Sequence, residues 1–167
     1  MERGSVAEWL GVLRTDPDNQ EGLEKLKGLV RNPDPQHKDS IIRQLELARA
    51  EHATAGAFRT AAELIQEEIA LVGEDDVNLS AALWHELARL RSEELLDDEG
   101  GLEALDEGLK RFPEHPTLIE LREELGRHAK GWKELSERYE REARDASNPA
   151  LRATLYARAG SLVWQYK

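Results

Sequence analysis

The sequence predicts an all-α fold that is built as a solenoid of antiparallel helix hairpins. Apolar residues recur at helical spacing, and Pro or Gly clusters separate the segments that carry them. A single hairpin cannot bury its own apolar face, so consecutive hairpins must stack. Trp84 and Tyr156 hold equivalent places in two such segments and lie 72 residues apart, which is close to two repeats of about 36 residues.

The clearest hairpin lies between residues 78 and 116. Its first helix has one apolar face, formed by Leu83, Trp84, Leu87, Ala88, Leu90 and Leu95. Residues 97–101, made of acids and glycine, are predicted to form the turn. The second helix has an apolar face of Leu102, Leu105 and Leu109, and Pro113 and Pro116 end it because proline cannot continue a helix.

The pattern of this hairpin resembles the tetratricopeptide repeat (TPR) family. Trp84, Leu87 and Ala88 match the aromatic, Leu and small positions of the family's first helix, whereas Arg91 stands where a Tyr is usual. The matches on the second helix and at its end are Gly101, Leu105, Gly108 and Pro113.

The resemblance implies a right-handed α-solenoid whose first helices line a concave groove. A peptide or partner helix would bind in that groove. Carrying the groove positions over to this chain gives the expected partner-binding residues: Arg43, Glu46, His85, Glu86, Arg89, Glu93, Arg158 and Trp164.

The whole chain, residues 1–167, is predicted to be one domain of approximate units 6–31, 36–73, 78–113, 116–146 and an incomplete 149–167. The helix over 6–15 is interpreted as the second helix of a repeat. Asp34 is the expected N-cap of the helix that begins near residue 35, and Pro35 lies in its first turn. Gly56 is expected to turn the chain, and Gly73 is the expected C-cap of the helix that ends near residue 72. The incomplete last unit predicts a fragment of a longer array, or an end that another copy covers.

Two short helices are predicted within 116–146. Thr117 and Glu120 have the spacing of a capping box, which predicts a helix start directly after Pro116. Residues 128–131 are predicted to form the turn of this unit. Asn148 is a suitable N-cap for the last helix.

Composition excludes several classes of protein. The chain has 167 residues, no Cys and a net charge of −11. Disulfides and thiolate zinc sites are therefore impossible, and the negative charge disfavours nucleic acid as a partner. No apolar run approaches the roughly 18 residues of a membrane span, and the N-terminus lacks a signal-peptide pattern. The cytoplasm is the expected compartment.

No motif in the sequence carries chemistry. The five His residues form no HExxH pattern, and there is no phosphate loop, nucleophile elbow or dinucleotide fingerprint. We expect no enzyme activity, cofactor or metal. The predicted function is a protein-interaction scaffold, with basic partners favoured by the negative charge. Two alternatives stay open: a structural segment that self-associates through its C-terminal helix, and a docking or regulatory domain of a larger enzyme.

Overall fold

The protein is all-α over the residues that the structure describes. The computed structural model covers residues 5–31 and 33–166, without the side chains of 129, 130, 165 and 166, and these ranges contain no strand. Asn32, in the predicted turn at residues 32–35, and Lys167, in the last predicted unit, lie outside the described residues. The helices are α1 (Val6–Thr15), α2 (Gln20–Val30), α3 (Lys38–Thr54), α4 (Phe58–Val72), α5 (Val77–Arg89), α6 (Asp98–Arg111), α7 (Pro116–Asp145) and α8 (Pro149–Tyr166).

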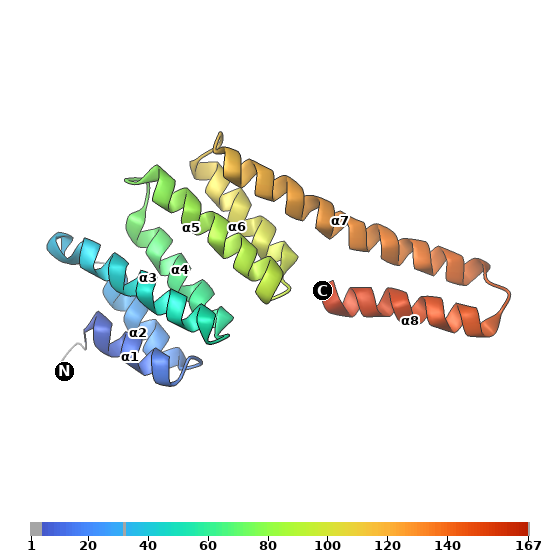
Figure 1. Ribbon diagram of the computed structural model, residues 1–167, viewed down its shortest axis with the longest axis horizontal. Helices are drawn as coiled ribbons and strands as arrows, with labels where there is room; N and C mark the ends of the chain where they lie inside the picture. The colour runs from blue at the N-terminus through green and yellow to red at the C-terminus, as the bar shows by residue number, and fades with distance from the viewer. Residues whose placement is uncertain (1–4, 32, 167) are drawn as a thin grey trace.

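Neighbouring helices pack as pairs, and the pairs lie side by side (Figure 1). The pairs are α1 with α2, α3 with α4, and α5 with α6; α1 also packs on α3, α2 on α4, and α5 on α7. Helix α1 pairs with α2 as α3 pairs with α4, and α2 and α3 do not form a comparable pair. The interpretation of α1 as a second helix of a repeat is therefore wrong, because α1 occupies the place of a first helix.

The C-terminal part of the chain leaves this stack. The first half of α7 packs on α5 and α6, while its second half continues outward and α8 folds back along it (Figure 1). We call residues 132–145 of α7 together with α8 the C-terminal arm.

Helix α4 belongs to both apolar cores of the stack. Leu64 and Leu71 pack into the first core with residues of α1, α2 and α3. Ala61, Ile65 and Ile69 pack into the second core with residues of α5, α6 and α7. The last residue of the first core is Leu71 and that of the second is Leu125, so neither core includes the described residues of the arm.

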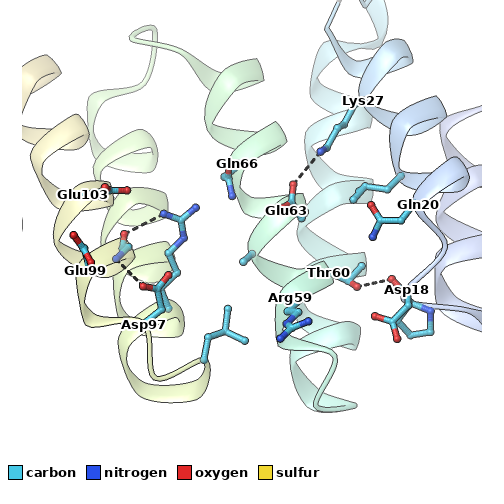
Figure 2. Close-up of a pocket in the computed structure, with 16 residues that line it drawn as sticks. Asp18, Gln20, Lys27, Arg59, Thr60, Glu63, Gln66, Asp97, Glu99 and Glu103 are labelled. Atoms are coloured by element: carbon cyan, nitrogen blue, oxygen red, sulfur yellow. Dashed lines mark hydrogen bonds and ion pairs between the residues drawn. The ribbon is translucent and has the colours of Figure 1, made fainter. Parts of the chain in front are cut away.

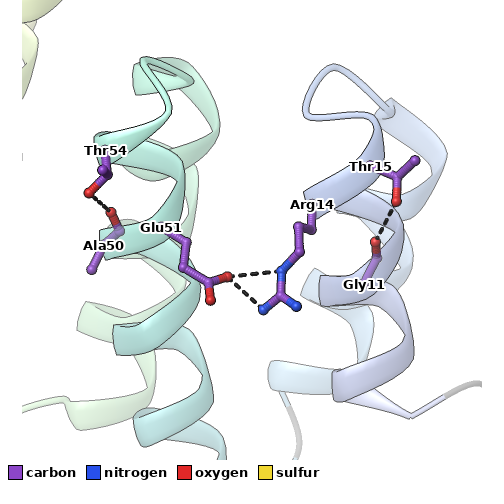
Figure 3. A network of polar contacts seen from close by, with 6 residues as sticks. All are labelled: Gly11, Arg14, Thr15, Ala50, Glu51 and Thr54. Carbon is purple, nitrogen blue, oxygen red and sulfur yellow. Dashed lines mark hydrogen bonds and ion pairs between the residues drawn. The ribbon is translucent and has the colours of Figure 1, made fainter.

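A polar contact adds to the apolar packing at the N-terminal end of the stack. Arg14 of α1 donates two hydrogen bonds to one carboxylate oxygen of Glu51 on α3, at 2.9 and 2.6 Å (Figure 3). Both side chains are more than half exposed, so this ion pair contributes only about 0–1 kcal/mol.

Helix α6 approaches α5 closely at two glycines. A Cβ on Gly108 would lie 3.0 Å from Cγ of Trp84, and one on Gly101 would lie 3.0 Å from the carbonyl oxygen of Ala88. A side chain at either position would therefore press against α5, on the ring of Trp84 or on the backbone at Ala88.

Several predicted helix ends are confirmed. Gly56 and Gly73 have φ angles of +77° and +64°, which side-chain-bearing residues rarely adopt. The side chain of Asp34 accepts a hydrogen bond from the backbone N–H of Gln36 in a single 3-10 turn, η1 (Pro35–His37), before α3. Asn148 accepts from the N–H of Ala150 at the start of α8.

The predicted turn at residues 128–131 is wrong, because α7 runs as one helix of 30 residues. Glycine in a helix interior costs only about 1 kcal/mol relative to alanine and does not end the helix by itself. The apolar spacing of Leu121, Leu125, Trp132 and Leu135 continues through this segment. Unit 116–146 is thus a single long helix and not a hairpin.

The predicted capping box of α7 is also absent. The helix begins at Pro116 as expected, but its N-cap is His115, which makes no side-chain capping hydrogen bond. The hydroxyl of Thr117 lies 3.0 Å from Nδ1 of His115 instead.

Gly131→Ala is expected to stabilise the protein. A Cβ at Gly131 would meet no atom within 4 Å, and alanine is favoured over glycine in a helix by about 0.5–1 kcal/mol. Urea unfolding followed by circular dichroism measures this gain. Gly56→Ala is the matched control and should lose stability, since its φ is positive. A loss at both positions would mean that the chain turns at residue 131.

Candidate functional site

A cleft of about 620 Å³ lies over α4, between α2 and α6. Figure 2 shows side chains of α4 on its floor and side chains of α2 and α6 on either side. The residues that line it are Pro17, Asp18, Gln20, Leu23, Lys27, Arg59, Thr60, Ala62, Glu63, Gln66, Arg91, Leu95, Asp97, Glu99, Gly100 and Glu103. We refer to this surface as the even-helix cleft.

Polar contacts hold the α2 side of the cleft in place. The hydroxyl of Thr60 donates to the carbonyl of Pro17 at 2.7 Å, and Lys27 pairs with Glu63 at 3.0 Å (Figure 2). Partial burial lowers the pKa of Lys27, but the hydrogen bonds and charges of Glu63 and Glu24 outweigh burial and leave the pKa raised. Lys27 is therefore charged, and its charge is already paired with Glu63 and Glu24.

The α6 side of the cleft follows an irregular turn. The end of α5 widens into a π-helical turn, η2 (Leu90–Glu94), in which the N–H of Leu95 donates to the carbonyl of Leu90 at 3.2 Å. Leu96 follows with a φ of +54°, a conformation that costs a bulky residue roughly 1–2 kcal/mol. Because the irregularity lies at the edge of the cleft, it marks this surface as a functional candidate.

This turn also corrects an expectation about the linker. Residues 97–101 were predicted to form the turn, but Asp97 is the N-cap of α6 and accepts from the N–H of Gly100 at 2.9 Å. Arg91 of η2 reaches across and donates to the carbonyl of Gly100 at 3.0 Å. The turn is therefore made by Leu95 and Leu96, whose side chains carry no turn signal.

A second cavity of about 260 Å³ extends the cleft along α6. The two cavities share Gln66, Arg91 and Glu103. Trp84 lines the second cavity, and the guanidinium of Arg111 lies 5.3 Å from the centre of its ring. The two cavities therefore adjoin along α6, and Trp84, which is only 9% exposed, forms part of the wall of the second.

The uncommitted charges of the cleft are mainly negative. Among the lining residues, all of which the structure describes, the acids Asp18, Asp97, Glu99 and Glu103 form no ion pair, and neither do the cations Arg59 and Arg91. Glu99 and Glu103 stand four residues apart on α6, so they project from the same side of that helix. The balance of these unpaired lining charges is negative.

The predicted partner-binding residues divide between two places. Arg43 and Glu46 lie on α3, His85, Glu86 and Arg89 on α5, and Glu93 on η2; these six belong to one surface, the odd-helix face. Arg158 and Trp164 lie on α8, outside the stack (Figure 1). The structure therefore does not bring all eight together.

Charges of the odd-helix face are largely satisfied within the protein. Arg49 of α3 bridges Glu68 of α4, at 2.8 Å, and Glu86 of α5. Arg89 pairs with Glu93 at 2.6 Å. Burial lowers the pKa of His85, and so does nearby Arg89, against the opposing charges of Glu124, Glu93 and Glu86. His85 is therefore a neutral side chain at neutral pH.

Arg49 and the cleft acids are the residues that sequence reasoning missed. Glu68 has a side chain that is 1% exposed, and burial raises the pKa of its carboxyl although the charge and hydrogen bond of Arg49 oppose this. A Glu inside the apolar stripe of α4 was the available signal that a cation had to lie opposite it. No comparable signal existed for Glu99 and Glu103, since their place depends on how α6 packs.

Comparison with protein-family models, with curated proteins and with solved structures finds no match to this chain. Within the described ranges, no group of three His, Asp or Glu side chains could hold a metal ion. None of the described helices is long and apolar enough to cross a membrane.

Leu96→Gly is expected to raise the free energy of unfolding by about 1 kcal/mol, because it removes the cost of a positive φ. Leu96 is 51% exposed, so little apolar burial is lost. Denaturant unfolding gives the value. Leu47→Gly, at a position in α3 that is 67% exposed, is the control and should instead cost about 1 kcal/mol. Equal losses would contradict the strain at Leu96.

Arg49→Met should destabilise the protein by about 3–5 kcal/mol, because it leaves the buried Glu68 carboxylate unpaired. The double variant Arg49→Met/Glu68→Met should recover most of that loss, since an apolar pair needs no compensation. Thermal and urea unfolding of the three proteins test this. A double variant as unstable as Arg49→Met would show that the ion pair is not the cause.

Proposed function

We propose that this chain is a non-catalytic interaction scaffold of the TPR-like type, with its helix pairs forming a right-handed solenoid. The paired helices and the contacts α1–α3, α2–α4 and α5–α7 support this. Gly101 and Gly108 add support, because each lies where α6 needs a small residue against α5, as the family pattern requires. A cytoplasmic location is compatible with a chain that has no Cys.

The even-helix cleft is the proposed binding site, and an extended segment carrying Lys or Arg is the proposed partner. The observation that carries this is the set of acids without an ion pair, Asp18, Glu99 and Glu103, on the two sides of the cleft. Leu23, Ala62 and Leu95 would contact the aliphatic part of the partner. The net charge of −11 would speed the encounter with a basic segment.

The odd-helix face is the less favoured surface for the same function. Binding a charged partner there would break the Arg49 and Arg89 ion pairs, and a buried carboxylate would lose its cation. The cleft offers charges that need no such exchange.

Isothermal titration with matched basic and acidic peptides of 12 or so residues tests the proposal. Glu99→Gln/Glu103→Gln should weaken binding of the basic peptide about tenfold and reduce its salt dependence. The control is Glu134→Gln/Glu137→Gln, which removes two exposed acids from the arm and should leave the affinity unchanged.

Two results would contradict binding of a basic segment in the even-helix cleft. Tighter binding of the acidic peptide would show that the sign of the field is not what selects the partner. Loss of binding in Arg43→Ala/Glu46→Ala, with full binding in Glu99→Gln/Glu103→Gln, would place the site on the odd-helix face.

A further inference from the structure

Helix α4 buries a carboxyl group that has no partner. Glu67 is only 8% exposed. It stands three residues after Leu64 and four before Leu71, so it lies on the face of α4 that enters the first core with them. The neighbouring Glu68 is held by Arg49, but Glu67 forms no hydrogen bond or ion pair with any residue that the structure describes. Burial of an unpaired carboxylate is costly.

The carboxyl oxygens of Glu67 still reach solvent. Within the described residues, the polar side-chain atoms that are fully enclosed and lack a partner are Oγ of Ser80 and Nε1 of Trp84. The oxygens of Glu67, which also lack a partner, are not among these enclosed atoms. Glu67 can therefore exchange a proton with water while α4 stays folded.

Helix α2 supplies charged groups that act on Glu67. Burial raises the pKa of Glu67, and the negative charges of Glu63 and Glu24 add to this effect. The cations Lys27 and Arg31 of α2 lower the pKa but do not cancel the rise. Lys27 is already paired with Glu63 and Glu24. Arg31, one turn beyond Lys27, is exposed and forms no ion pair with the described residues.

The charged groups on the other side of α4 face Glu68 instead. Arg49 of α3 bridges Glu68 and Glu86 of α5. The charge of Glu46, also on α3, acts on Glu68 as well. Arg49 is therefore committed to two other carboxylates and does not neutralise Glu67.

Glu67 lies in a contact that attaches the N-terminal hairpin to the stack. The α1–α2 hairpin packs on the next pair mainly through α1 on α3 and α2 on α4. Lys27 pairs with Glu63 across the α2–α4 contact, and the hydroxyl of Thr60 on α4 donates to the carbonyl of Pro17, just before α2 (Figure 2). Glu67 stands one helical turn beyond Glu63, so its charge acts on the same contact.

We propose that Glu67 makes the attachment of the α1–α2 hairpin dependent on a proton. The neutral carboxyl lets α2 pack on α4, and the ionised carboxylate loosens that contact. Because α2 forms one side of the even-helix cleft, the same proton holds that side of the cleft in place.

The attachment strengthens as the pH falls. Because the pKa of Glu67 is raised in the folded chain, the folded chain takes up the proton at a higher pH than the unfolded chain. Stability is gained as the pH falls through the folded pKa, and the gain is complete below the usual pKa of Glu, about 4.3. His52 of α3 acts in the opposite direction, because burial and nearby Arg14 lower its pKa against the charge of Glu51.

Hydrogen exchange of the full chain at pH 7.5 and 5.0, expressed as protection factors, tests the proposal. In the parent, the amides of α1 and α2 should be better protected at pH 5.0. Glu67→Gln should raise their protection at pH 7.5 by about tenfold or more, because it removes a buried charge without a partner, and it should abolish the difference between the two pH values. Glu74→Gln, at an exposed acid just beyond α4, is the control and should behave as the parent does.

Arg31→Gln is an independent test at an exposed position. It removes a cation that favours the Glu67 carboxylate, so protection of α1 and α2 should fall by a larger factor at pH 7.5 than at pH 5.0. Equal protection of the parent at both pH values would overturn the proposal. A pH dependence that persists in Glu67→Gln would also overturn it, since another group would then titrate, and so would one that Arg31→Gln leaves as in the parent.

Discussion

The fold depends on the burial of α4 on two adjacent faces, each in a different core. Leu64 and Leu71 belong to one core, and Ile65 and Ile69 belong to the other. A thin helical layer can join its neighbours only if one helix contributes to both cores, and each contact then stabilises the next layer. The same constraint encloses Glu67 and Glu68, and burial raises the pKa of both carboxyls. Arg49 offsets the burial of Glu68, since it supplies the cation that a buried carboxylate requires.

The even-helix cleft is a consequence of how α4 is used. With two sides committed to the cores, its remaining side presents Arg59, Glu63 and Gln66 to the surface. Helix α2 contacts α4 directly, whereas α6 reaches it mainly through α5 and η2. The space between α2 and α6 is therefore open above α4. The π-helical turn and the positive φ of Leu96 lie at this edge, where the chain changes from α5 to α6.

The C-terminal arm lies outside both apolar cores. Beyond Leu125 the chain leaves both cores, and the buried residues of α7 and α8 there are Leu155 and the small residues Ser136, Ala143 and Ala159. Tyr156 and Trp164 of α8 therefore stay exposed, at 46% and 88%.

The sequence by itself determined the helices whose ends are set by local chemistry. Residues 6–15, Gly56, Gly73 and Asn148 were placed correctly because backbone conformation and capping act over a few residues. Tertiary structure alone decided the continuity of α7, the turn at Leu96 and the ion pair of Arg49. In each case a local preference of about 1 kcal/mol competes with packing between helices that are distant in sequence, and packing is the larger free energy.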